Sequence, residues 1–262
     1  AGQVQAGGCI QLVMPDLNAG SALQSEWGFE VPAVSYAAPT SGTPSAIAFF
    51  NASSRTLTVV TAGATMSQST QHVITITNVR TPSSIVGANQ VRATTQDSAG
   101  RTIDTTTSMA TDAIAAGALV SAELDASTDT PGFLHEAIVT FTTAGQVQAG
   151  GKIVLVLPDL PDTGRGWRFQ SPSVTFTAPS SGAPSVSASF NSSLRTLTLT
   201  TANATMAQAT QHVITISNVH TPSSIVNATT MQAMVLDSTD KSIDATSDMV
   251  VDQIAAGSFT GA

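Results

Sequence analysis

Apolar residues alternate with Ser and Thr, with a period of two residues, along much of the chain. The alternation is clear at 174–179 (VTFTAP), 185–190 (SVSASF), 195–201 (RTLTLTT) and 212–217 (HVITIS). A period of two places the apolar side chains on one face of a β-strand and the polar ones on the other. β-Branched residues crowd these stretches, and Gly, Pro, Asn and Asp separate them. The pattern therefore predicts half-buried strands.

Other segments add strands of two kinds. The apolar runs 10–15 (IQLVMP) and 153–158 (IVLVLP) each end at a proline, which cannot donate to a β-ladder. Strand patterns also flank Ser-Ala-Gly within 90–107 and Ser-Thr-Asp within 232–247, and they predict two hairpins. No stretch predicts a long helix. Strands at intervals of roughly 8–12 residues are typical of a β-sandwich.

The chain contains two copies of one pattern. AGQVQAGG at 1–8 returns at 144–151, and QHVITITNVRTPSSIV at 71–86 returns at 211–226 with two residues changed. A period near 140 residues indicates a duplicated domain, because solenoid repeats are roughly 20–50 residues long. We therefore expect an all-β protein of two tandem antiparallel Greek-key β-sandwiches (Ig-like), spanning 1–119 and 120–262.

The copies differ at their start. Residues 119–143 (LVSAELDASTDTPGFLHEAIVTFTT) precede the second copy and have no counterpart before the first. We expect the first domain to lack its N-terminal strand or strands and to present an open sheet edge, a template for another chain. We place this assembly edge at six residues: Ala1, Gln3, Val4, Ile10, Leu12 and Val13.

Two other interpretations of the difference stay open. The chain is a window from a longer repeat protein, or the first domain rearranges and closes its own edge. The tail 258–262 (SFTGA) corresponds only to the start of 119–143, so a like subunit would not donate the whole segment from that end.

The segment VTFTTAGQVQAGGKIVLVLP at 139–158 has the order strand, small-residue loop, Gly-Gly, strand and Pro. It resembles the tandem Ig-like β-sandwich repeats of extracellular surface and filament proteins of microbes and algae. The resemblance implies a cell-surface or fibre protein, and it brings no catalytic residues with it.

Composition adds one expectation, which concerns the chemical character of the protein surface. Only 10% of the residues are charged, whereas 42% are hydrophobic, so hydroxyl groups must cover much of the surface. Few charges give little protection against self-association, which suits a protein that assembles or carries sugars. The net charge of −8 excludes a nucleic-acid partner. No apolar run approaches the ~20 residues that span a membrane, and the single cysteine, Cys9, excludes an internal disulfide.

Modification sites are the main candidate chemistry. Four Asn-x-Ser/Thr sequons lie in predicted loops or at strand ends and predict covalent glycans: Asn51, Asn191, Asn203 and Asn227. Asn51 and Asn191 are equivalent positions of the two copies, whereas Gly63 and Gly87 stand where the second copy has Asn203 and Asn227.

A cation site and a sugar platform are weaker candidates. Asp237, Asp240 and Asp244 form an acidic cluster that is a weak candidate for Ca²⁺, because a solvated hairpin turn explains the same residues. Trp27 and Trp167 recur in register, and we interpret them as core residues; stacking on sugar is the alternative. We expect no zinc site, no nucleophile elbow and no cofactor.

The sequence therefore predicts a secreted, non-enzymatic structural subunit. It would form a glycosylated extracellular filament or cell-surface coat, with copies joined head to tail by strand complementation of the first domain. The alternative is an adhesin or a carbohydrate-binding module of a larger secreted protein, and exposure of both tryptophans on one flat face would favour it.

Overall fold

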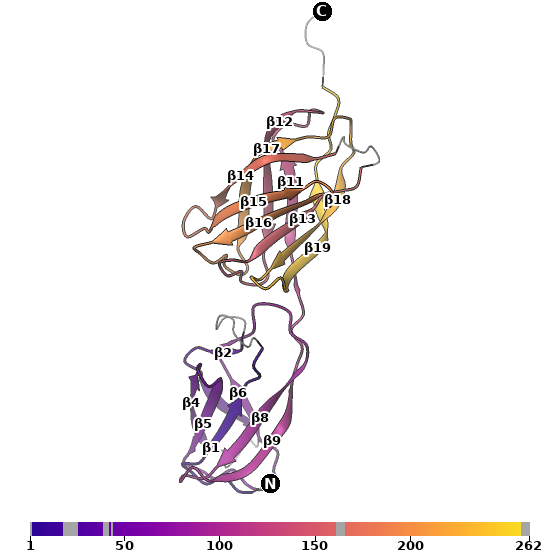
Figure 1. Ribbon diagram of the computed structural model, residues 1–262. Helices are drawn as coiled ribbons and strands as arrows, with labels where there is room; N and C mark the ends of the chain where they lie inside the picture. Colours follow the sequence, from indigo (N-terminus) through magenta and orange to yellow (C-terminus); the bar gives the residue numbers. More distant parts are fainter. Residues whose placement is uncertain (1, 18–25, 39–41, 43, 161–165, 258–262) are drawn as a thin grey trace, which may run out of the picture. The chain divides into compact units, whose positions relative to one another are not determined.

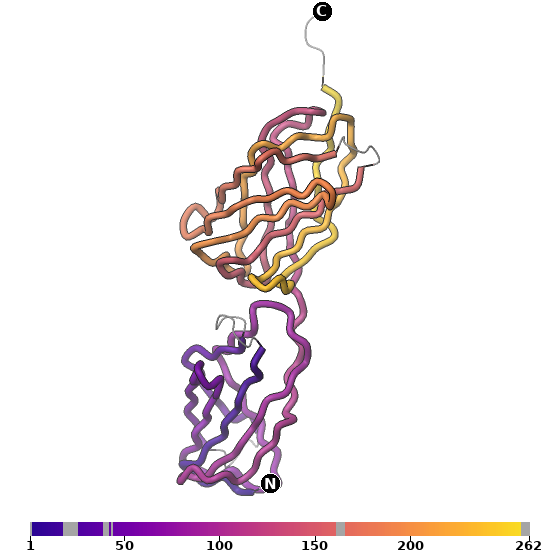
Figure 2. Tube along the Cα trace, viewed as in Figure 1, coloured from indigo at the N-terminus to yellow at the C-terminus, as the bar shows by residue number. Residues whose placement is uncertain are grey.

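The computed structural model describes the chain except at residues 1, 18–25, 39–41, 43, 161–165 and 258–262. Its regular elements in the described part are all β-strands. The chain divides into two compact units, one made of Ala1–Pro82 and Val86–Ala115 and the other of Ser83–Ile85 and Ala116–Ala262. Figure 2 shows that the chain winds within each unit, from indigo to magenta in the first and from magenta to yellow in the second. The boundary at 119/120 stays a prediction.

The first unit contains nine strands within its described residues. In chain order they are β1 (Cys9–Val13), β2 (Gly28–Phe29), β3 (Val34–Ala38), β4 (Ser45–Asn51), β5 (Thr56–Ala62), β6 (Val73–Ile76), β7 (Val79–Arg80), β8 (Asn89–Gln96) and β9 (Thr102–Thr111).

The described part of the second unit repeats these nine strands as seven, because β14 spans the counterparts of β2 and β3 and β17 those of β6 and β7, and it adds three strands before them. The additional strands are β10 (Gly117–Ala118), β11 (Val120–Ala126) and β12 (Leu134–Thr142). The repeated ones are β13 (Lys152–Val156), β14 (Arg168–Ala178), β15 (Ser185–Asn191), β16 (Thr196–Ala202), β17 (Gln211–His220), β18 (Thr229–Leu236) and β19 (Ser242–Val251).

Both expected hairpins form, with β8 paired to β9 and β18 paired to β19 in antiparallel register. The second hairpin closes where the backbone N–H of Asp237 donates to the carbonyl of Lys241 at 2.9 Å. The two proline-terminated runs form β1 and β13, each of which ends two residues before its proline.

The strands form separate sheets in the described part of the first unit but one continuous sheet in the second. In the first unit, a five-stranded sheet has the order β4-β5-β1-β8-β9, and the pairs β2–β7 and β3–β6 are separate. In the second unit, one ten-stranded sheet has the order β14-β17-β12-β11-β19-β18-β13-β16-β15, with β10 beside β19. Strands β11 and β12 make this connection, because they lie between β17 and β19. The fold is thus all-β with antiparallel pairing, except where β10 and β11 run parallel to β19.

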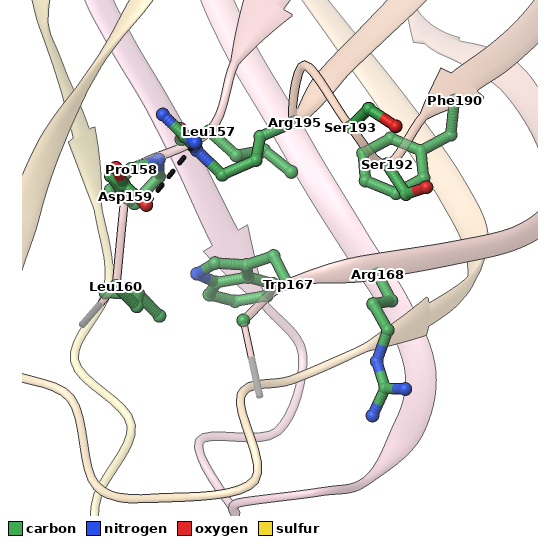
Figure 3. A pocket seen from close by; sticks show the side chains of 11 residues that line it. Leu157, Pro158, Asp159, Leu160, Trp167, Arg168, Phe190, Ser192, Ser193 and Arg195 are labelled. Carbon is green, nitrogen blue, oxygen red and sulfur yellow. Dashed lines mark hydrogen bonds and ion pairs between the residues drawn. The ribbon is translucent and has the colours of Figure 1, made fainter. Parts of the chain in front are cut away.

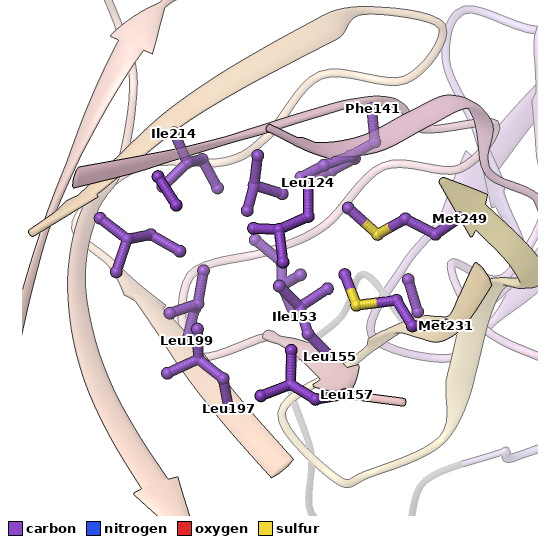
Figure 4. Close-up of a cluster of buried hydrophobic side chains, with 14 of the residues drawn as sticks. Leu124, Phe141, Ile153, Leu155, Leu157, Leu197, Leu199, Ile214, Met231 and Met249 are labelled. Carbon is purple, nitrogen blue, oxygen red and sulfur yellow. The ribbon is translucent and has the colours of Figure 1, made fainter. Parts of the chain in front are cut away.

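A continuous apolar core fills the second unit (Figure 4). Leu124 of β11 and Phe141 of β12 lie in it with Ile153, Leu199 and Met249 from the repeated strands. The buried apolar side chains of the described part of the first unit are fewer: Val4, Met14, Leu57, Val59, Met66 and Val91. Because burial of apolar surface is the main stabilising contribution to folding, the first unit has the weaker core.

Candidate assembly surface and glycan acceptor sites

Strand β12 is the centre of the connection in the second unit. It pairs with β17 on one side, where Ala137 lies opposite Ile216 and Val139 opposite Ile214. It pairs with β11 on the other side, where Val139 lies opposite Leu124. Backbone groups on both edges of β12 are therefore satisfied within the sheet.

Strand β11 connects β12 to β19 within the ten-stranded sheet. It runs parallel to β19, with Glu123 opposite Val250 and Leu124 opposite Val251. Its alternation buries Leu124 and Ala126 and exposes Glu123 and Asp125. Leu124 and Val139 are fully buried, and so are Ile214 and Ile216 beside them. Together β11 and β12 close one side of this unit.

The described residues of the first unit include counterparts of β17 and β19, but none of β11 and β12. Among the described residues, β6 pairs only with β3, and β9 pairs only with β8. We call β6 (Val73–Ile76) and β9 (Thr102–Thr111) the two open edges. A strand edge without a partner leaves backbone N–H and C=O groups available to another chain.

Identical apolar residues at equivalent positions differ in exposure between the two units. Val79 is 40% exposed, whereas its counterpart Val219 is fully buried. Met109 is 45% exposed, whereas Met249 is fully buried. Strands β9 and β7, the two-residue strand that follows β6, therefore expose apolar side chains whose counterparts form the core of the second unit.

The histidines at the start of β6 and β17 show the same contrast. His212 is buried, with its ring 5.7 Å from that of Phe141 of β12 and 6.0 Å from that of Phe176. Burial lowers the pKa of His212, because the charged imidazolium would lose its hydration. His72 lies only half-buried beside Tyr36, with ring centroids 6.3 Å apart.

The residues expected to form the assembly edge lie elsewhere. Strand β1 is paired on both sides, with β5 and with β8, so Ile10, Leu12 and Val13 are not at an open edge. Val4 is buried and bridges to Met66 through two backbone hydrogen bonds of 3.2 and 2.9 Å. Placing the edge at these residues was wrong, because β1 is paired on both sides. In the second unit, β11 and β12 lie beside β19 and β17 rather than beside β13, the strand that follows them in sequence.

The remaining two residues of that set belong to the N-terminal segment. Ala1 lies outside the described residues, and Gln3 is exposed. The segment is nevertheless tied down, because the backbone N–H of Gly2 donates to Asp104 Oδ2 at 2.7 Å. In the second unit, the N–H of Gly145 donates to Asp244 Oδ2 at 3.1 Å in the same way.

The acidic residues considered for Ca²⁺ do not converge. Asp237 Oδ1 accepts from the N–H groups of Thr239 and Lys241, at 2.8 and 3.0 Å, and shapes the hairpin turn. Asp240 forms an ion pair of 2.6 Å with Lys152. Asp244 is fully buried beneath 144–145, and burial raises its pKa. In the described part of the chain, no group of three His, Cys, Asp or Glu side chains could hold a metal ion.

All four sequon asparagines are exposed. Asn51 and Asn191 end equivalent strands, and each side-chain oxygen accepts from the backbone N–H two residues on, at 3.0 Å in both units. Asn203 has a φ of +70° where Gly63 has +76°, and its Nδ2 donates to Ser185 Oγ at 2.8 Å. Exposure is necessary for glycan attachment, and attachment itself stays a prediction.

A small pocket lies beside Trp167 (Figure 3). Its volume is about 250 Å³, below the roughly 300–1,000 Å³ of ordinary ligand sites. Arg195 crosses its rim, donating to the carbonyl of Leu157 and pairing with Asp159 at 3.3 Å. Trp167 is only 5% exposed, and Trp27 is half-buried. Neither tryptophan forms a flat exposed platform for sugar.

The sequence could have revealed the open edges only in part. Nothing in residues 1–118 corresponds to 119–143, and the strands that such a segment would pair with depend on the topology. One signal in the sequence points to these edges. Val79 and Met109 are as apolar as Val219 and Met249, which are buried in the second unit.

No protein-family model matches the chain, and no curated protein matches it. Solved structures that resemble it include the C-terminal domain of the AgI/II polypeptide BspA of Streptococcus agalactiae, at 9% identity and a TM-score of 0.30, covering 96% of this chain and 85% of that chain. Another is the type II cohesin dyad of the scaffoldin ScaA of Acetivibrio cellulolyticus, at 11% identity and a TM-score of 0.27, covering 92% and 87%. Likenesses at this level carry no argument about function.

Proposed function

We propose that the protein is a structural subunit of a glycosylated extracellular filament or cell-surface coat. In this assembly, a neighbouring copy supplies β-strands to the open edges β6 and β9 of the first unit. One observation carries the proposal: the second unit holds two strands, β11 and β12, at the position that is unfilled in the described part of the first.

The receiving surface favours a strand over a compact ligand. The edge of β6 offers unpaired backbone groups, and Val79 and Met109 offer apolar contact beside the open edges. An added strand satisfies both needs, since main-chain hydrogen bonds give affinity and alternate side chains give specificity. The low charge of the chain, 10% of residues, leaves little electrostatic repulsion against association.

The second unit shows what the donated segment must look like. It needs a strand antiparallel to β6 followed or preceded by one parallel to β9, because β12 and β11 have these orientations. It also needs buried apolar residues at the positions of Leu124, Val139 and Phe141. Residues 119–143 show this pattern, but in each copy they are already paired and buried within the second unit. A neighbouring copy can therefore donate them only by exchanging them out of its own second unit.

The extracellular location and the lack of catalysis rest on weaker support. Four exposed sequons favour passage through a secretory pathway that attaches sugars. The resemblance of 139–158 to surface and filament repeats supports the same location. No helix in the described part is long and apolar enough to cross a membrane. The carbohydrate-binding alternative loses support, because Trp167 is buried.

The test is association of the full chain, with and without a competing peptide. Sedimentation velocity over a hundredfold range of concentration should show species larger than a monomer. A synthetic peptide of residues 119–143 should bind the chain in a 1:1 ratio and suppress those species. The control peptide carries Val139→Asp and Phe141→Asp, which place charges where burial is required, and should do neither.

Compact monomers at every concentration would overturn the homopolymer, even if the peptide binds. Equal binding of the two peptides would overturn strand complementation, because the contact would then not depend on the buried positions.

A further inference from the structure

Strand β4 of the first unit carries large apolar side chains on its solvent face. Ile47 is 69% exposed and Phe49 is 53% exposed, whereas the alternate residues Ala48 and Phe50 face inward. Asn51, the asparagine of a sequon, is the next residue on the same outward face. Side chains two residues apart on a strand point the same way and lie about 7 Å apart.

The second unit lacks this exposed apolar surface. Ser187 and Ser189 stand where the first unit has Ile47 and Phe49, and Asn191 still ends the strand. The inward face keeps its aromatic pair, since Phe29 and Phe50 pack at 5.0 Å and their counterparts Phe169 and Phe190 at 5.1 Å, and the other inward residues stay apolar. Core packing therefore does not explain Ile47 and Phe49.

The neighbouring strands extend the contrast. Ile47 lies opposite Val60, and Val60 lies opposite Cys9 on β1. The equivalent row of the second unit is Ser187, Thr200 and Lys152. An apolar row on an outward face is costly in water unless something covers it.

The turn after β4 fixes the acceptor side chain. The Oδ1 atom of Asn51 accepts from the N–H groups of Ser53 and Ser54, at 3.0 and 3.3 Å. This places the side-chain oxygen over the turn and leaves Nδ2 as the atom that bonds to sugar. The first sugar then begins one side-chain spacing from the ring of Phe49.

We propose that Phe49, extended by Ile47, is a packing platform for the first sugar residue of a glycan linked to Asn51. One face of a pyranose ring presents C–H groups, and such a face packs on an aromatic ring with its hydroxyls left in water. The sugar covers the exposed ring and restrains the end of β4. The proposal rests on the glycosylation contained in the proposed function, and it is independent of strand complementation.

The test compares the two units of one secreted, full-length chain by hydrogen–deuterium exchange. Ser53→Ala removes the sequon hydroxyl without altering Asn51, and Ser193→Ala does the same at Asn191. Loss of the Asn51 sugar should speed exchange of the β4 and β5 amides several-fold. Loss of the Asn191 sugar should leave exchange in β15 and β16 nearly unchanged.

Removing the aromatic ring from β4, or adding one to β15, should reverse the effect that loss of the sugar has on amide exchange. With Phe49→Ser in place, Ser53→Ala should no longer affect β4 and β5. With Ser189→Phe in place, Ser193→Ala should speed exchange in β15 and β16. Intact mass of each variant reports whether the sugar is present.

Absence of sugar at Asn51 in the secreted chain would overturn the platform and leave the association experiment unaffected. A sugar at Asn51 whose loss affects β4 equally with and without the Phe49→Ser substitution would overturn the platform alone.

Discussion

At the scale of single residues, equal side chains have unequal environments in the two units. Val79 and Val219 are the same residue in the same repeat position, yet one is 40% exposed and the other is fully buried. The strand propensity of valine and the local pattern of apolar and polar residues are the same at both positions, so neither explains the difference in exposure. Burial depends on whether a strand covers the side chain.

Truncation of equivalent methionines should therefore have unequal effects. Met249→Ala should lower the free energy of unfolding of the second unit by about 2–5 kcal/mol, because it leaves a cavity in a closed core. Met109→Ala should cost less than about 1 kcal/mol in the dispersed chain, since Met109 is 45% exposed. Urea unfolding of each variant measures both effects, and equal losses would contradict an open β9.

The carboxyl group of Asp252 should make stability depend on pH. Burial, then a hydrogen bond with Asp125 and the nearby charges of Asp125, Asp129 and Glu123, raise its pKa to about 6. A folded pKa above the unfolded value contributes stability at low pH, and that contribution is lost as pH rises through about 6.

Asp252→Asn should therefore stabilise the second unit at pH 8 by about 1–2 kcal/mol, after allowance for solvent screening. It should have little effect at pH 4, where Asp252 is already protonated. Urea midpoints at the two pH values measure the difference. A gain at pH 4 that equals the gain at pH 8 would contradict the raised pKa of Asp252.

At the scale of elements, the sequence predicts where strands form better than it predicts which strands pair with one another. The alternation at 185–190 and 195–201 correctly predicts β15 and β16, and the turn residues correctly predict both hairpins. Alternation shows which face of a strand is buried, but not which edges are paired. The assembly edge was misplaced onto β1 for this reason, although β1 lies between β5 and β8.

The entry of β10 beside β19 depends on a glycine. A Cβ atom added at Gly117 would lie 2.6 Å from the Cβ of Ala144 and closer still to the carboxylate of Asp244. Gly117→Ala should therefore push β10 away from β19 and destabilise the second unit by about 1–3 kcal/mol. Thermal unfolding measures this loss. Unchanged stability would show that β10 does not need its close approach to Asp244.

At the scale of the whole molecule, one fold occurs in a closed and an open form. The second unit supplies its own β11 and β12, and the described first unit has no strand in their place. In the proposed assembly, a donated segment would complete the core of the first unit. This difference makes the chain a candidate acceptor of strands, and the four exposed sequons make it a candidate carrier of sugars.

Amide hydrogen exchange of β6 tests the central claim most directly. In dilute chains, the amides of Val73–Ile76 that do not pair with β3 should exchange far faster than their counterparts in β17. In the assembled protein, or with the peptide of residues 119–143 bound, they should become as protected as those of β17. Slow exchange of β6 in dilute monomers, or fast exchange in assembled fibres, would contradict an edge completed by a neighbouring strand.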